Sequence, residues 1–345
     1  MQNNTNEAKR GFGSDNHATI HPLILKSITA ANVGHAPSYG TDQWTEMAIK
    51  EFQKQFGTPV DVHFVFNGTA ANVLSLRATI TRYQTALCSD VSHLHHDECG
   101  APEFFAGKTI PIESSNGKIS IASLEKFVVR QGDQHYSQPR VVSLTQPTEL
   151  GTCYTIQEIK DICTWAHKNN LYVHVDGARL ANAVAYLKTD FKSMLTDTGV
   201  DILSFGGTKN GLMFGEAVVI FNDGLKKDFK YIKKQSAQLP SKTRYVACQF
   251  LAYFHEELYL KMAKNALERA AELYEGLRQF KQFELNWAPE SNAVFPKIPQ
   301  PLVKKLKEHS FFYVWDETTF VCRLMTSWDT TSDDIQNFIA YCKTL

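Results

Sequence analysis

Several features that would place a protein in a special class are missing from this 345-residue sequence. Its 36 Lys and Arg residues balance 36 Asp and Glu residues, which argues against a broad basic surface for nucleic acid and against an acidic, solvating tail. The longest apolar stretches, such as residues 217–221, are far shorter than the ~20 residues that a membrane helix needs. We therefore expect a protein that binds neither nucleic acid nor membranes.

The cysteines and the N-terminal segment indicate a reducing compartment. Seven cysteines are scattered without any CxxC spacing, a pattern that suits reduced and mostly buried thiols. Residues 1–10 are polar and amide-rich, and they contain no apolar segment of the kind found in a secretory signal. We interpret this segment as a frayed tail and expect a cytoplasmic protein.

Short apolar runs alternate with helical patterns between about residues 60 and 221. Such alternation predicts a mostly parallel sheet with helices on its faces. The expected strands are residues 62–66, 85–88, 140–144, 171–175, 201–205 and 217–221, and the expected helices include residues 69–83, 121–130 and 155–169. The last of these helices begins with a capping box, because Glu158 stands three residues after Thr155.

A different pattern follows residue 221. A long helical pattern covers residues 244–280, and the sequence ends with strand-like runs at residues 292–295, 311–315 and 319–326 and a helical pattern at residues 332–342. This pattern is typical of a smaller α+β unit. At about 150 residues per domain the length suits two domains, an N-terminal arm with a large domain at residues 1–247 and a small domain at residues 248–345.

Three chemically distinctive segments follow predicted strands, at the edge where open α/β sheets bind ligands. The turn at residues 66–72 leads into a helix. The free backbone N–H groups of Gly68 and Thr69 can hold a phosphate there, although the same pattern also suits an ordinary helix start. Asp176 ends an apolar strand, where a carboxylate can hold a positive charge on a bound heterocycle or cap a helix. Lys209 is flanked by glycines, and a lysine in a tight pocket can form a Schiff base.

Together these segments resemble the pyridoxal-phosphate enzymes of the aspartate aminotransferase fold (fold type I), whose cofactor needs a lysine and an Asp partner for its ring nitrogen. The closer resemblance is to the threonine aldolase and β-eliminating lyase family, and it covers about residues 11–340. Besides His-Val-Asp-Gly-Ala-Arg and Gly-Gly-Thr-Lys-Asn-Gly, it is carried by residues 13–16, 39–44, 92–103 and 322–329. The second of these motifs is similar to the bacterial low-specificity branch.

The resemblance implies how pyridoxal 5'-phosphate would be bound. Lys209 would form a Schiff base with the cofactor, and Asp176 would pair with the pyridine nitrogen. His93 would stack on the ring, while Gly68 and Thr69 would hold the phosphate. Lys209, Asp176 and His93 are the catalytic residues that the resemblance implies.

The resemblance also implies how the substrate would be bound. Arg179 would lie near the cofactor's ring oxygen and the substrate carboxylate, and Ser14 and Arg323 match the family's carboxylate-binding positions, for which a bidentate Arg is suited. Because a neighbouring subunit reaches into the site in this family, we expect a homo-oligomer, a dimer or a tetramer. The candidates for this contribution are Tyr39, which would contact substrate, and Lys234 and Arg244.

One segment departs from the family pattern. Many members have a His before an Asn-Gly on the loop that reads Thr-Gln-Pro-Thr-Glu-Leu-Gly here, at residues 145–151. Glu149 stands near that position. The base that takes the proton of the substrate's β-hydroxyl is therefore left open between Glu149, His93 and a water molecule.

The expected activity is cleavage of L-threonine, L-allo-threonine and related β-hydroxy-α-amino acids to glycine and an aldehyde, after the substrate amine displaces Lys209 from the cofactor. An alternative with the same cofactor is a β-eliminating lyase acting on an aromatic or sulfur amino acid. A more distant alternative is a metal-dependent hydrolase built on His93, His95, His96 and Glu98. This cluster lacks the i, i+4 pair of a HExxH helix, so we expect no metal site.

Overall fold

The structure is a computed structural model that describes residues 10–345. The predicted frayed tail therefore lies outside the described residues, apart from Arg10. A seven-stranded sheet with the order β1-β7-β6-β5-β4-β2-β3 organises the first two thirds of the chain. Its strands are β1 (Asp61–Val65), β2 (Gln84–Ser89), β3 (Lys108–Ile112), β4 (Gln138–Thr145), β5 (Tyr172–Gly177), β6 (Ile202–Phe205) and β7 (Glu216–Ile220).

Most neighbouring strands of this sheet run parallel, as the alternating pattern predicts. The pairs β2–β3, β2–β4, β4–β5 and β5–β6 are parallel, whereas β7 is antiparallel to both β6 and β1. The sequence pattern predicts every strand except β3. That strand lies at the sheet edge and contains Pro111, a residue that lacks the N–H of a ladder and is tolerated at an edge.

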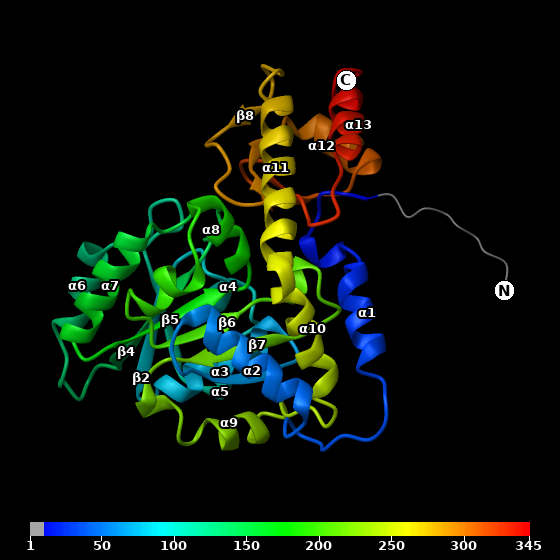
Figure 1. Cartoon of the computed structure of the whole chain (residues 1–345). Helices are drawn as coiled ribbons and strands as arrows, with labels where there is room; N and C mark the ends of the chain where they lie inside the picture. Colours follow the sequence, from blue (N-terminus) through cyan, green and yellow to red (C-terminus); the bar gives the residue numbers. More distant parts are fainter. Residues whose placement is uncertain (1–9) are drawn as a thin grey trace.

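Helices cover the faces of the large sheet (Figure 1). They are α1 (Pro22–Ala30), α2 (Gln43–Phe56), α3 (Gly68–Thr79), α4 (His93–His96), α5 (Ala101–Phe105), α6 (Ile121–Val128), α7 (Ile156–Lys168), α8 (Leu180–Leu187), α9 (Phe229–Gln235) and α10 (Arg244–Phe254). The capping box predicted for α7 is present, with Thr155 and Glu158 each accepting the other's backbone N–H.

The continuous helix predicted over residues 244–280 is wrong. The segment is divided into α10 and α11 (Leu258–Leu277) by a kink at which Glu256 and Glu257 have φ angles of 48° and 55°. The kink lets α10 pack against α1 and α2, while α11 contacts α8 and then α13 (Ser332–Cys342). In Figure 1, α11 runs from the large sheet to the small unit.

The small unit contains an antiparallel sheet with the order β11-β12-β10-β8, and β9 pairs with β12. Its elements are β8 (Glu284–Leu285), β9 (Ala293–Val294), β10 (Pro296–Lys297), α12 (Gln300–His309), β11 (Tyr313–Asp316) and β12 (Val321–Met325). The core of the large sheet extends along α11 to Ala263, and a second core begins at Ala270. The division at residue 247 stays a prediction about folding units.

A cluster of aromatic rings lies behind the end of β6. Phe52 meets Phe205 and Phe250 edge to face, with ring centroids 5.1 and 5.2 Å apart, and all three side chains are fully buried. Such interlocked rings are densely packed and resist displacement. The residues that follow β6 are therefore built on a rigid base.

Two expectations from composition can be compared with the structure. Six of the seven cysteines are buried and Cys99 is exposed, which confirms mostly buried thiols without disulfides. None of the helices in residues 10–345 combines the length and the apolar character that a membrane span requires.

Candidate active site

A cavity of about 560 Å³ lies at the carboxyl ends of the parallel strands, between the large sheet and the small sheet. It is bordered by residues that follow β2, β4, β5 and β6, by the N-terminal segment, and by β11 and β12. The lining residues are Ser14, Asn16, Val91, His93, His96, Asp97, Glu149, Arg179, Lys209, Tyr313, Val314, Trp315 and Arg323. Five of the residues predicted from sequence, Ser14, His93, Arg179, Lys209 and Arg323, thus line one cavity.

Lys209 is carried by a tight turn directly after β6. A Cβ on Gly206 would lie 2.2 Å from the carbonyl oxygen of Ala178, and the Gly206 N–H donates to the carbonyl of Gly177 at 3.0 Å. Only glycine permits this close approach of two strand ends. The amine of Lys209 makes no hydrogen bond or ion pair with any residue in the described part of the chain, so it is available to a ligand.

Asp176 lies near the end of β5 (Tyr172–Gly177), is 3% exposed and does not line the cavity. Its Oδ1 accepts the N–H of Ala178 at 3.0 Å, and its Oδ2 accepts from the side-chain amide of Asn72 at 2.9 Å. A carboxylate accepts about four hydrogen bonds. Asp176 therefore has capacity for a further donor, such as the N–H of a protonated heterocycle.

His93 and Asp176 belong to one hydrogen-bonded chain. The side-chain amide of Asn72 also donates to Glu98 Oε1 at 3.1 Å, and the same oxygen lies 2.8 Å from His93 Nδ1. The hydrogen bond to Glu98 raises the pKa of His93 against the opposing effect of burial, and the charges of Glu149 and Asp176 add to the rise. Glu98 thus fixes both the orientation and the proton affinity of the imidazole.

Arg179 is already paired within the chain. Its Nε and Nη2 donate to the two carboxylate oxygens of Asp15 at 2.6 and 3.1 Å, and Asn292 donates to Asp15 at 3.1 Å. Burial alone would raise the pKa of Asp15, but the charges of Arg179 and Lys209 outweigh it and hold that pKa below its usual value. The bidentate pair leaves Arg179 rigid at the cavity wall.

Arg323 is held by fewer and longer hydrogen bonds than Arg179. Its Nη2 makes a long contact of 3.5 Å with the carbonyl of Gly13, and its buried Nε has no partner among the described residues. The guanidinium lies 5.2 Å from the ring centroid of Trp315 and 5.8 Å from that of Tyr313. Burial and the charge of Arg179 lower its pKa, so an anion between the two arginines would relieve their repulsion.

The predicted phosphate turn opens α3. Asn67 is the N-cap, and its side chain accepts the N–H of Ala70 at 2.9 Å. A Cβ on Gly68 would meet nothing within 4 Å, so there is open space beside the first turn of the helix. The N–H groups of Gly68 and Thr69 are the first of the helix, where an anion is favoured.

Six predicted residues do not line the cavity: Asp176, Gly68 and Thr69, described above, and Tyr39, Lys234 and Arg244. Tyr39 is 52% exposed, and the amine of Lys234 lies 5.4 Å from its ring centroid. Arg244 donates to the carbonyl of Val33 at 3.1 Å and lies 5.5 Å from the ring centroid of Trp44. The role of Tyr39, Lys234 and Arg244 in the site of a neighbouring subunit stays a prediction.

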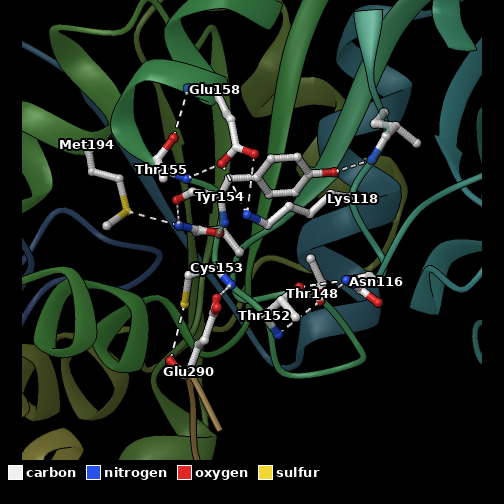
Figure 2. Close-up of polar contacts among 12 residues, drawn as sticks. Asn116, Lys118, Thr148, Thr152, Cys153, Tyr154, Thr155, Glu158, Met194 and Glu290 are labelled. Atoms are coloured by element: carbon white, nitrogen blue, oxygen red, sulfur yellow. Dashed lines mark hydrogen bonds and ion pairs between the residues drawn. The ribbon is translucent and has the colours of Figure 1, made fainter. Parts of the chain in front are cut away.

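Glu149 lines the cavity from a loop that is anchored on two sides. Figure 2 shows the anchoring residues Thr148, Thr152, Cys153 and Glu290. The hydroxyls of Thr148 and Thr152 lie 2.7 Å apart, and Thr152 donates to the carbonyl of Asn116 at 2.7 Å. From the small unit, the Glu290 carboxylate accepts the N–H of Cys153 at 2.7 Å. Because the carboxylate of Glu149 has no hydrogen bond or ion pair within residues 10–345, a fixed loop presents a free carboxylate to the cavity.

The histidines after β2 are bonded to neighbouring groups of the chain. His93 is bonded to Glu98, and His96 Nε2 lies 2.5 Å from the carbonyl of Asp90. Within residues 10–345, no group of three or more His, Cys, Asp or Glu side chains is arranged to hold a metal ion. That the protein has no metal site stays a prediction.

Comparison with known proteins settles the family. The model of the beta-eliminating lyase family matches residues 11–298. The chain belongs to this family. It is 39% identical to the low specificity L-threonine aldolase of Pseudomonas aeruginosa over 331 residues, 94% of each chain, and 38% identical to that of a Pseudomonas species over 335 residues, 95% of this chain and 96% of the relative.

Solved structures agree with the family and the fold. A threonine aldolase from Leishmania major has a TM-score of 0.92 and 28% identity, with 97% of this chain and 99% of that chain covered. An aspartate aminotransferase from Thermus thermophilus has a TM-score of 0.72 at 15% identity, with 98% and 93% covered, and supports the fold alone. The predicted fold type I architecture is confirmed.

The family is pyridoxal-phosphate dependent, so the protein is a lyase of that class. The residues present fit this cofactor. Asn72 Oδ1 and Glu98 Oε2 are buried without partners in the described part of the chain, and open space adjoins Gly68. His93 and Asp176 would hold its ring, the start of α3 would hold its phosphate, and Lys209 would bind it covalently.

The structure adds site residues that sequence reasoning missed. Asp15 lies within residues 13–16, but no role was predicted for it. Asn72 had no role beyond its place in the phosphate turn, and a role was considered for Glu98 only as a metal ligand. Glu216, which accepts the N–H of Gly207, was not considered. A sequence signal existed for Glu216, because a carboxylate directly before the apolar run 217–221 is unusual for a strand that is buried throughout.

Proposed function

We propose that the protein cleaves L-threonine, L-allo-threonine and related β-hydroxy-α-amino acids to glycine and an aldehyde. The observation that carries this proposal is the high similarity, over nearly the whole chain, to proteins named low specificity L-threonine aldolases. The cavity supports it, because Lys209, Arg323 and Glu149 line one space and, within residues 10–345, none of the three forms an ion pair.

Each side chain has a part in this proposal. Lys209 binds the cofactor covalently, and Asp176 holds the proton on the pyridine nitrogen. His93 contacts the ring face, and Arg323 binds the substrate carboxylate. When bound, pyridoxal phosphate supplies the electron sink for the carbon that loses its bond. The chain's own contribution is to hold the breaking bond in a productive orientation and to move the proton of the β-hydroxyl.

Two side chains can take that proton. Glu149 has no partner within the described part of the chain and lies on an anchored loop, which favours a base that needs no rearrangement. His93 is bonded to Glu98, which raises its pKa and makes it the stronger acceptor when neutral. Glu149→Gln removes the carboxylate and keeps the shape. If Glu149 is the base, kcat should fall by about two orders of magnitude or more with little change in KM.

The decisive test is a product assay with recorded absorption spectra. L-threonine and L-allo-threonine should yield glycine and acetaldehyde, and Lys209→Ala should abolish both turnover and covalent uptake of pyridoxal phosphate. Lys305→Ala, an exposed lysine on α12, is the matched control and should behave as the unchanged protein. Release of a keto acid instead would identify a β-eliminating activity. Failure to take up pyridoxal phosphate would contradict the proposal.

The proposal extends to assembly and location. We propose a homo-oligomer, a dimer or a homotetramer, in which Tyr39, Lys234 and Arg244 approach a neighbouring site, and we propose a cytoplasmic protein. Light scattering should give at least twice the 39.0 kDa of one chain. If Lys234 completes a neighbouring site, Lys234→Ala should weaken cofactor retention without changing the fold.

A further inference from the structure

Glu216 is a buried carboxylate that the proposed reaction does not use. It begins β7 and is 6% exposed. It pairs across the ladder with Val65 of β1, the strand that leads into the phosphate turn, while the next residue, Ala217, pairs with Phe205 of β6. Glu216 therefore lies between the two strands whose ends carry the predicted phosphate turn and the reactive lysine.

The partners of this carboxylate are the two residues directly before Lys209. Its Oε2 accepts the N–H of Gly207, and the nearby N–H and hydroxyl donors of Thr208 act to lower the pKa of the carboxyl. The Thr208 hydroxyl oxygen in turn accepts the N–H of Gly215 at 3.1 Å. The donors that the turn would otherwise leave unsatisfied inside the protein thus converge on one side chain.

We propose that Glu216 is a positioning residue for Lys209: its buried carboxylate gathers the donors of Gly207 and Thr208 and so sets the point from which the lysine reaches the cavity. Glu216 does not touch the cofactor itself. It acts through the turn, which is also confined by Phe250 and Leu212 on the other side of Gly207.

Burial of Glu216 argues for a specific use of its acceptor oxygens. Desolvation raises the pKa of Glu216 to about 7, although the hydrogen bonds from Gly207 and Thr208 and the charge of Lys209 act in the opposite direction. An apolar side chain at this position would avoid the cost of burying a carboxyl group. It would also lose the oxygen that accepts the buried N–H of Gly207 in the lysine turn.

Hydrogen exchange in the cofactor-free chain tests the positioning directly. In Glu216→Ala, the peptide covering residues 204–212 should exchange at least about tenfold faster, because a buried N–H loses its acceptor. Glu216→Gln, which keeps an oxygen acceptor, should restore most of the protection. The matched control is Asp201→Asn, which removes another buried carboxylate at the opposite end of β6, where it holds Val173 and Asn222. This control should leave the 204–212 peptide unchanged.

Covalent uptake of pyridoxal phosphate provides the second readout. It depends on the proposed function only because that proposal identifies the cofactor. The borohydride-trapped fraction should form at least about tenfold more slowly in Glu216→Ala than in the Gln variant or the Asp201→Asn control. Should Glu216→Ala fail to fold, Glu216→Asp, whose carboxylate is one methylene shorter, should show the same defects to a smaller extent.

Wild-type exchange and wild-type uptake in a folded Glu216→Ala or Glu216→Asp protein would overturn the inference. Equal defects in Asp201→Asn would do the same, because they would show a general loss of stability. A chain that takes up the cofactor normally but does not cleave L-threonine contradicts the proposed function and leaves the role of Glu216 intact.

Discussion

Replacing Glu216 by Gln should change the pH dependence of stability in a defined direction. Burial raises the pKa of this carboxyl from 4.5 to about 7 on folding. Because its pKa is raised on folding, the Glu216 carboxyl binds a proton more tightly in the folded chain than in the unfolded chain. The contribution of this proton to stability is therefore complete below pH 4.5 and is lost as the pH rises through 7. Gln carries no such proton, so Glu216→Gln removes this slope.

The size of the effect follows from the same two pKa values. At about 1.4 kcal/mol per tenfold difference in proton affinity, the full loss is about 3 kcal/mol, and most of it falls between pH 5 and pH 8. The charged or titratable side chains that interact with Glu216 are Lys209 and Tyr253, and both are retained in the variant. The difference between the two proteins therefore isolates the carboxyl.

Urea unfolding of the cofactor-free proteins at several pH values measures this difference. Relative to the unchanged protein, the stability of Glu216→Gln should increase steadily from pH 5 to pH 8, and tryptophan fluorescence reports the transition. Parallel stability curves for the two proteins would refute the reasoning, because they would show that the Glu216 carboxyl does not change its proton affinity on folding. A slope of the opposite sign would mean that Lys209 and the hydrogen bonds outweigh burial.

Three further perturbations have clear expected outcomes. Glu98→Gln removes the main cause of the raised pKa of His93, so the imidazole should titrate at a lower pH in an NMR experiment; an unchanged titration would contradict the assigned pairing. Asp15→Asn leaves Arg179 charged and without its bidentate partner, which should cost about 3–5 kcal/mol of unfolding free energy; a cost below 1 kcal/mol would mean that water replaces the pair. Asn67→Ala removes the N-cap of α3 and should cost about 1 kcal/mol while weakening phosphate-dependent uptake of the cofactor, both measurable by calorimetry.

Much of the fold was open to prediction because the large sheet is buried on both faces. Its strands read as continuous apolar runs, and Asp176 and Lys209 interrupt this pattern at strand ends, where they are easily recognised. The edge strand β3 lacks this signal, since it contains Pro111 and, of its five residues, only Thr109 and Ile112 are buried. The kink after α10 lacked any glycine or proline and depends on how two helices pack against different parts of the protein.

The remaining site residues depend on contacts between distant positions. Asp15 and Arg179 are separated by 164 positions, and Asn72 and Asp176 by 104. An Asp or Asn carries no local sign of its partner, so the pairing of Arg179 with Asp15 could not be predicted when Arg179 was placed near the cofactor's ring oxygen and the substrate carboxylate. Arg323, which was predicted at the carboxylate as well, has an Nε without a partner among the described residues, and both roles stay predictions.

The N-terminal segment explains why this site requires both sheets. Phe12 donates its N–H to the carbonyl of Phe311 at 2.7 Å, and its carbonyl accepts the N–H of Met325 at 2.8 Å, so the segment is bonded to the small unit. Three residues further, Asp15 is bonded to Arg179 at the end of β5 in the large sheet. A short stretch of backbone therefore ties the two sheets together at the cavity. A displacement of the small unit would carry Asp15 away from Arg179 as it moves Arg323, and the electrostatic balance of the site would change together with its shape.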